Sequence, residues 1–273
     1  MEKTEKEMDS LEERYEQGQE MRKTLAGTNP SHYSIPGTDQ LAPDLRRIID
    51  ECLFGKIWTR QGLNLKQKSI CTISVLMANG QMALLKRHIE RGLTVGLTPN
   101  QIVEVFIQLT FYVGIPQVEN ALLLTREIFE ENSVSFEPTL DYDINKSVES
   151  LEKEGINKHQ EHYQDIDAYL DDNASAIEIE IEQLVNQYHW GAIYTRPHLD
   201  AKERSMCSLA ALSALGVYDR QVRRRIEGAL QLGITPGEIL EVFVQVMLYG
   251  GYFSTRSAIR VARSVFAEKG LKV

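Results

Sequence analysis

The chain has 273 residues, of which 42% are hydrophobic and 25% are charged, and its formal net charge is −9 at pH 7. These values are typical of a globular protein with two domains of ordinary size, each able to bury a core. Non-specific nucleic-acid binding requires clustered Lys and Arg, so the acidic balance argues against it.

The sequence contains no run of about 18 apolar residues, so we expect no membrane span. Residues 1–18 are charged and lack the apolar segment of a signal peptide, which favours a cytoplasmic protein. The three cysteines, Cys52, Cys71 and Cys207, form no CxxC pair, so a disulfide scaffold is not expected.

The first half of the chain is predicted to be helical, with clear start and stop signals. Asn64 suits an N-cap, and Thr98 suits another because Pro99 follows it at the first helical position. Gly96 suits the position that ends the preceding helix. The predicted helices cover residues 5–26, 44–54, 66–77, 81–96, 99–112 and 117–130.

The second half begins with polar helices over 147–154 and 166–188, the latter with a break expected near 172–173. Asp200 and Glu203 then form the pattern of a capping box. No stretch of the chain shows sustained alternation with period two, so the predicted fold class is all-α.

The chain contains an internal repeat, because residues 54–131 recur as 190–268 at an offset of about 137 residues. A solenoid unit has about 20–50 residues, whereas this period has the size of a domain. The pairs in register include Gly55 and Gly191, Arg60 and Arg196, Cys71 and Cys207, Glu104 and Glu241, and Tyr112 and Tyr249. We therefore predict an N-terminal arm plus first repeat over 1–132, a linker over 133–146 and a second repeat over 147–273.

The first copy resembles the carboxymuconolactone decarboxylase family, which has the alkylhydroperoxidase D-like fold. The residues that carry the resemblance are Phe54-Gly55-x-x-Trp58-x-Arg60-x-Gly62-Leu63, Arg87-His88, Gly96-x-Thr98-Pro99-x-x-Ile102-x-Glu104 and Tyr112-x-Gly114-x-Pro116. The resemblance implies helical subunits that pair into dimers, with three dimers in a ring. A tandem chain would then be one pseudo-dimer and three chains would complete the ring; the alternative is a pseudo-dimeric monomer.

The resemblance also implies a lyase of aromatic-compound catabolism that removes a carboxyl group from a small anionic lactone, without a metal or other cofactor. Two alternatives stay open on the same scaffold. One is a lactone hydrolase or isomerase, and the other is a non-catalytic oligomeric binding protein.

A peroxidase branch of the same family uses a CxxC pair followed by a His, with a Glu upstream. His88 matches that His, but the two cysteine positions hold Gln81 and Leu84, and the Glu position holds Ser69. A dithiol peroxidase needs two thiols within bonding distance, so this activity is not expected.

His88 is the predicted proton relay, because an imidazole exchanges protons near pH 7; the alternative is a core histidine. Arg60, Glu104 and Tyr112 complete the predicted catalytic set. Arg suits a substrate carboxylate, although Arg60 and Glu104 could instead form a structural ion pair. The predicted substrate contacts are Trp58, Cys71, Gln81, Arg196 and Arg225.

The two copies differ at positions that bear on chemistry. Arg225 replaces His88, and Phe253 replaces Pro116. Activity is therefore expected in the first half, and the second half is interpreted as a partner domain or as a site for an anion.

Overall fold

The computed structural model describes residues 10–28, 36–163, 165–166, 169–216 and 219–272. This part of the chain consists of helices, turns and loops without a strand, which confirms the all-α prediction. The helices of the first half are α1 (Leu11–Ala26), α2 (Pro36–Leu41), α3 (Pro43–Ile48), η2 (Ile49–Ile57), α4 (Leu65–Ala78), α5 (Met82–Thr94), α6 (Pro99–Gln108), α7 (Thr110–Val113) and α8 (Ile115–Glu131). Those of the second half are α9 (Val148–His162), α10 (Ala176–Leu184), η3 (Val185–Ile193), α11 (Ala201–Leu215), α12 (Asp219–Gln231), α13 (Pro236–Gly250) and α14 (Tyr252–Glu268).

Local capping signals are confirmed. Asn64, Thr98 and Asp200 each accept a hydrogen bond from the backbone of the third helical residue, and each belongs to a complete capping box. The first predicted helix begins at Leu11 behind the N-cap Ser10, and residues 5–9 of that prediction lie outside the described part.

Several predicted helices are wrong in extent. The polar helix predicted over 147–154 continues to His162, and the helix predicted over 44–54 is divided into α3 and η2. The helix predicted over 99–112 ends at Gln108, and the short α7 follows after Leu109. The helix predicted over 166–188 begins only at Ala176, where Ser175 caps its first turn, and the π-helix η3 continues it.

Each repeat contains a π-helix that is crossed by its arm helix at glycines. η2 packs on α1 and η3 packs on α9. A Cβ atom on Gly18 would lie 2.0 Å from the Asp50 carbonyl oxygen, and one on Gly155 would lie 1.7 Å from that of Asn186. Only glycine permits backbones to approach this closely. The arm therefore belongs to the duplicated unit.

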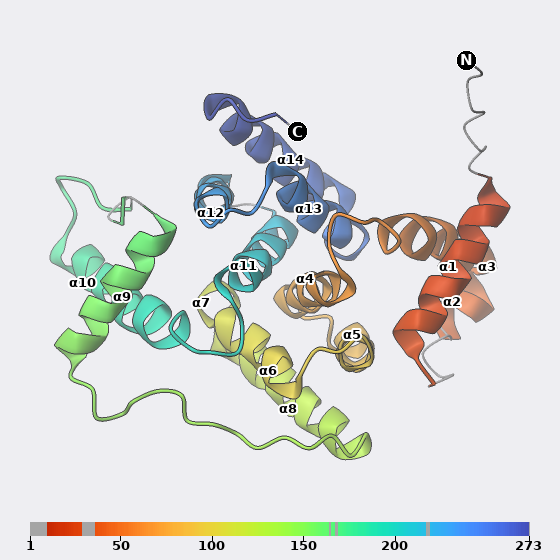
Figure 1. Cartoon of the computed structure of the whole chain (residues 1–273), viewed down its shortest axis with the longest axis horizontal. Helices are drawn as coiled ribbons and strands as arrows, with labels where there is room; N and C mark the ends of the chain where they lie inside the picture. The colour runs from red at the N-terminus through yellow and green to blue at the C-terminus, as the bar shows by residue number, and fades with distance from the viewer. Residues whose placement is uncertain (1–9, 29–35, 164, 167–168, 217–218, 273) are drawn as a thin grey trace.

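The two repeats share one hydrophobic core. α4 and α11 pack against each other at the centre of the molecule, with α1–α3 at one end and α9 and α10 at the other (Figure 1). A single cluster of buried side chains runs through both, from Ile70 and Phe106 to Leu209 and Phe243. The expectation of a separate core for each half is therefore wrong.

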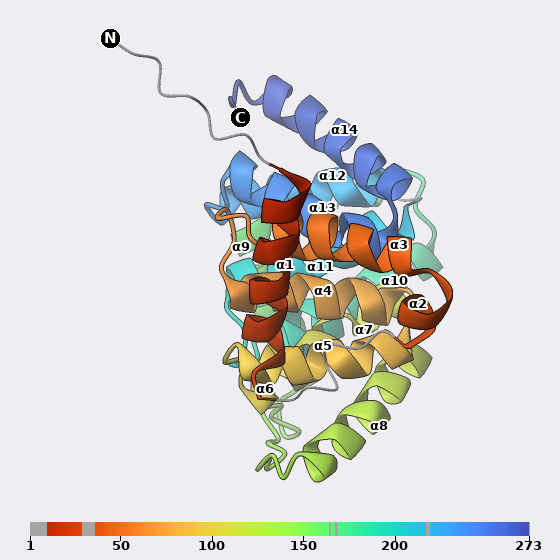
Figure 2. The same ribbon diagram turned by 90° about the vertical axis from the view of Figure 1, so that its right-hand side faces the viewer.

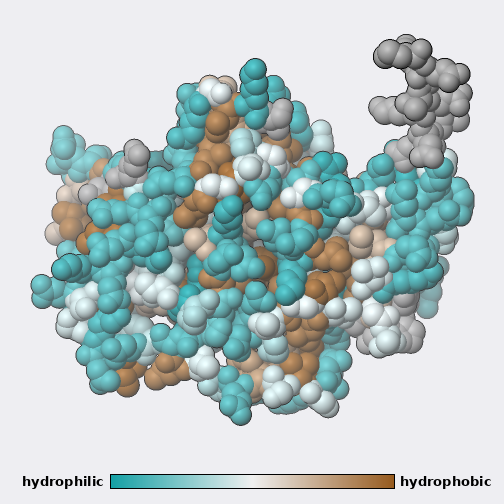
Figure 3. Space-filling model, viewed as in Figure 1, coloured by the Kyte–Doolittle hydropathy of each residue, from teal (hydrophilic) through white to brown (hydrophobic). Residues whose placement is uncertain are grey.

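The outer helices frame this core. Figure 2 shows α8 and α14, which are equivalent helices of the two repeats, at opposite ends of the molecule with α4 and α11 between them. The segment between α8 and α9 contains no helix and runs along the outside of the molecule (Figure 1). Hydrophilic side chains cover most of both ends of the face in Figure 3, and apolar ones gather towards its middle.

None of the helices in the described ranges combines the length and apolar composition of a membrane span. The same residues contain no group of three or more His, Cys, Asp and Glu side chains placed to hold a metal ion.

Candidate functional site

His88 lies in a composite aromatic cluster to which both repeats contribute. It is on α5 and is 2% exposed. The Trp58 ring stacks on it with centroids 6.1 Å apart, and Tyr249 of α13 meets it edge-on at 5.2 Å. Trp58 Nε1 donates a hydrogen bond of 3.0 Å to the Tyr249 hydroxyl, which ties the two repeats together.

Arg91 supplies a buried positive charge beside His88. It lies one helical turn further along α5, and its Nη1 is 3.4 Å from His88 Nε2. Burial lowers the pKa of Arg91 to about 10, so the guanidinium still carries its charge at neutral pH. Arg91 is not among the residues predicted from the sequence, although its spacing of three from His88 places both on one helix face.

Tyr249 occupies the place that the sequence analysis gave to Tyr112. Burial raises the pKa of Tyr249 to about 12, so the phenol stays protonated at neutral pH. It accepts from Trp58, and among the described residues no acceptor takes its own proton. Tyr112 lies in a different cluster, because each of these tyrosines sits at the end of a helix that crosses to the opposite repeat.

A second cluster surrounds Arg225. Its guanidinium lies over the rings of Tyr112, Tyr163 and Trp190, with centroids 5.2, 5.5 and 5.5 Å away. Arg225 donates to the Tyr163 hydroxyl at 2.7 Å, and the hydroxyls of Tyr112 and Tyr194 are 3.1 Å apart. Within the described ranges no carboxylate forms an ion pair with this partly exposed Arg.

A buried acid of the first repeat, Asp50, has no acidic counterpart in the second repeat. Asp50 pairs with Arg22 at 2.8 Å under α1. In the second repeat His159 and Asn186 stand in these places, with Nδ1 and Oδ1 3.0 Å apart. Burial lowers the pKa of His159 to about 4, so this pair is neutral at pH 7.

Two more histidines complete the second cluster, and they belong to none of the motifs recognised in the sequence. His162 and His189 are both buried around Trp190. His162 Nε2 and His189 Nδ1 are buried without a hydrogen-bond partner in the described structure. Burial lowers the pKa of His162 to about 4, and burial also lowers the pKa of His189 well below its usual value.

The Arg and Glu residues that recur at equivalent positions of the two repeats form ion pairs that cross between the repeats. Arg60 pairs with Glu241 and not with Glu104, through Nε to Oε2 at 2.7 Å and a second contact from Nη2. Arg196 pairs with Glu104 at 2.9 Å, where Arg204 binds the same carboxylate at 2.9 Å. The crossing gives these residues a role in holding the repeats together.

A buried lysine supports the first of these pairs. Lys68 Nζ donates to the Trp58 carbonyl at 2.7 Å and also to that of Arg60. Burial is the main reason that the pKa of Lys68 falls to about 8. Arg204 takes the same position in the second repeat, where it also donates to Gln108 at 2.8 Å.

Cys71 lies in the shared hydrophobic core, and Gln81 lies on the surface. Cys71 is fully buried near Cys207, and burial raises the pKa of both thiols. This position argues against the predicted substrate contact. Gln81 is exposed at the start of α5, two helical turns before His88.

Comparisons with known proteins give a consistent family. The sequence profile of the carboxymuconolactone decarboxylase family matches residues 43–127 and 180–264. A 4-carboxymuconolactone decarboxylase of Acinetobacter baylyi is 28% identical over 124 residues, which are 45% of this chain and 92% of that protein. A nitrosuccinic acid decarboxylase of Metarhizium robertsii is 23% identical over 117 residues, which are 43% of this chain and 82% of the relative. An uncharacterized 15.0 kDa protein of Paracoccus denitrificans is 28% identical over 118 residues, 42% and 86% of the two chains.

Proposed function

Because this chain belongs to the carboxymuconolactone decarboxylase family, we propose that it is a decarboxylase that acts, without a cofactor, on a small anionic lactone or a related carboxylate. Two of the relatives carry decarboxylase names, which supports this reaction class. The observation that carries the proposal is the cluster in which His88, Arg91 and Tyr249 meet.

Decarboxylation breaks the bond between the carboxyl carbon and its neighbour and leaves the electron pair on the substrate. A conjugated lactone carbonyl accepts this pair as an enolate, and a nitro group accepts it as a nitronate. The protein then has to stabilise the new oxyanion and deliver one proton to carbon. Carboxylates next to such an acceptor group are therefore the proposed substrate class.

The cluster in the first repeat offers one group for each task. Arg91 stays charged at neutral pH and would bind the carboxylate or the developing oxyanion. Tyr249 keeps a proton to donate to the same oxygen. His88 would protonate carbon and regain its proton from solvent in each turnover.

The second repeat is proposed to support this site and not to duplicate its chemistry. A guanidinium stays protonated in proteins, so Arg225 cannot relay a proton as His88 would. The second repeat supplies Tyr249 to the first site. The cation of Arg225, with no carboxylate beside it in the described structure, supports the role of an anion site.

The decisive experiment is an ultraviolet assay without added cofactor, with 4-carboxymuconolactone and nitrosuccinate as substrates and with CO2 release measured in parallel. We expect turnover by the wild type and a loss of about 100-fold or more in kcat for His88→Gln. Tyr249→Phe should lose about 10-fold or more. Lys86→Ala, a change on the helix that carries His88, should leave the rate within about twofold of wild type, because Lys86 forms a surface ion pair with Glu131.

His88 is almost fully buried, and this burial favours one alternative function: a binding protein in which His88 has a structural role. In that case neither substrate would be consumed, or His88→Gln would turn over as fast as the wild type. Loss of the lactone without release of CO2 would instead indicate a hydrolase or isomerase.

A further inference from the structure

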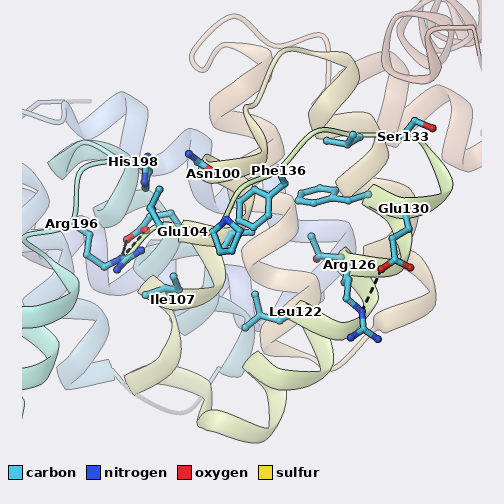
Figure 4. A pocket seen from close by; sticks show the side chains of 16 residues that line it. Asn100, Glu104, Ile107, Leu122, Arg126, Glu130, Ser133, Phe136, Arg196 and His198 are labelled. Atoms are coloured by element: carbon cyan, nitrogen blue, oxygen red, sulfur yellow. Dashed lines mark hydrogen bonds and ion pairs between the residues drawn. The ribbon is translucent and has the colours of Figure 1, made fainter. Parts of the chain in front are cut away.

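A cleft of about 690 Å³ lies between α6, α8 and the segment that links the repeats (Figure 4). This size falls in the range of small-molecule sites, which is about 300–1,000 Å³. Its walls are mainly apolar, and the side chains that form them are Val103, Ile107, Leu122, Phe129, Phe136 and Pro138. No residue of the His88 cluster or the Arg225 cluster lines it.

One end of the cleft is polar and already holds a carboxylate. Arg196 and His198, which precede α11, lie at this end beside Glu104 (Figure 4). The linker residue Asp141 places its Oδ2 at 3.2 Å from Arg196 Nη2 and at 3.2 Å from His198 Nε2. A carboxylate can only accept here, so both side chains act as donors to it.

The charges at this end leave a place for one exchangeable anion. Glu104 is buried and accepts hydrogen bonds from both Arg196 and Arg204. Its single negative charge balances one of the two guanidinium charges, and Asp141 balances the other. Asp141 sits on an exposed segment, whereas Glu104 sits inside a helix. Asp141 is therefore the carboxylate that can leave without disturbing the core.

The first repeat shows the same Arg without this arrangement. Among the described residues the Arg60 guanidinium forms an ion pair with Glu241 alone, and it is 47% exposed. The linker thus gives the second repeat two things that the first lacks. Phe136 and Pro138 form one wall of the cleft, and Asp141 adds a second carboxylate beside Arg196.

We propose that this cleft binds an amphipathic monocarboxylate, with its carboxylate on Arg196 and His198 and its alkyl or aryl body between α6, α8 and Phe136. The linker acts as an internal competitor, because Asp141 occupies the same donors until the ligand displaces it. This site is separate from the proposed decarboxylase centre, and its test requires no enzymatic activity.

The test is calorimetric titration of the full chain with decanoate and, as a neutral probe of matched length, decanol. Asp141→Asn removes the competing charge, so we expect decanoate to bind about threefold to tenfold more tightly while decanol changes by less than twofold. Asp143→Asn, two residues away in the same segment, is the matched control and should leave both affinities as in the wild type.

Two further arms locate the ligand. Leu122→Trp fills the cleft and should weaken decanoate at least tenfold, and shortening the probe to octanoate should cost about fourfold per methylene removed. The proposal is overturned if decanoate fails to bind both the wild type and Asp141→Asn, or if Asp141→Asn affects decanol and decanoate equally. Should Leu122→Trp fail to fold, the comparison of acid and alcohol on Asp141→Asn decides alone.

Discussion

His88 and Arg225 occupy equivalent positions of the two repeats, but different side chains surround them. His88 has an Arg within 3.4 Å and a protonated phenol against its ring. Arg225 is flanked by aromatic rings, and burial keeps the histidines of its cluster neutral. An imidazole exchanges protons near pH 7, whereas a guanidinium keeps its charge, so Arg225 cannot carry the relay proposed for His88.

The histidines of the second cluster predict loss of stability in mild acid. Burial lowers the pKa of His159 and His162 to about 4, against about 6.5 in an unfolded chain. The unfolded state therefore binds more protons below pH 6.5. The free energy of unfolding should be full above pH 6.5 and fall as the pH drops towards 4, by up to about 3 kcal/mol for each histidine.

Urea unfolding at pH 7.5, 6.0 and 5.0 measures this slope. His162→Gln removes one of the three buried histidines of this cluster and should make the pH dependence shallower, whatever its effect on stability at pH 7.5. Equal slopes for His162→Gln and the wild type would contradict the assignment.

Site residues whose partners lie in the same repeat could be predicted from the sequence. Contacts between residues of different repeats could not. His88 and Trp58 were expected together and lie together. Tyr112 was expected beside His88, but Tyr249 is there. In the packed repeats, α13 of the second repeat brings Tyr249 to His88, and α7 of the first repeat brings Tyr112 to His189. Arg60 likewise was placed with Glu104 and pairs with Glu241. Such contacts depend on tertiary packing, which no local pattern encodes.

At the scale of the elements, the π-helices η2 and η3 place the aromatic residues of both clusters. η2 contains Phe54 and ends just before Trp58, η3 contains Trp190 and ends just before Tyr194, and each π-helix packs against the arm helix of its repeat. The sequence predicted an ordinary helix over 44–54, because π-helical segments are rare and occur mostly within α-helices. The caps at Asn64 and Thr98 were predictable because they rest on neighbouring side chains.

The crossing of α1 and η2 predicts a strong effect of a small substitution. A Cβ atom on Gly55 would lie 2.1 Å from the Arg14 carbonyl oxygen, which is backbone and cannot rotate away. Gly55→Ala should therefore lower the free energy of unfolding by about 3 kcal/mol or more. Gly237→Ala is the control: its Cβ would have only the Thr235 hydroxyl at 3.9 Å, so it should be neutral or stabilise by up to about 1 kcal/mol. Similar losses for the two variants in urea unfolding would refute this account.

At the scale of the whole molecule, reciprocal contacts join the repeats. Trp58 with Tyr249 on one side corresponds to Tyr194 with Tyr112 on the other. The pairs of Arg60 with Glu241 and Arg196 with Glu104 repeat the pattern. This is the geometry of a two-fold interface, and it supports the pseudo-dimer expected from the sequence.

The exposed apolar side chains predict assembly of several chains. They recur at equivalent positions of the two repeats, and the chief ones are Leu41, Leu45, Ile48, Ile177, Ile181 and Leu184. Patches of this kind mark interaction surfaces. We expect light scattering after gel filtration to give the mass of three chains, and the double variant Leu45→Glu with Ile181→Glu to give that of one. A wild type that elutes as a single chain at micromolar concentration would exclude the ring.

The crossed contacts between the repeats have a consequence for how this protein could evolve. In a dimer of two identical subunits, every mutation appears twice, so a change that adapts one site also changes the other. Joining the two copies in one polypeptide removes that constraint while both still contribute side chains to each site. Arg225 could therefore arise without cost to His88, and gene fusion permits one protein to hold two unlike sites on one duplicated scaffold.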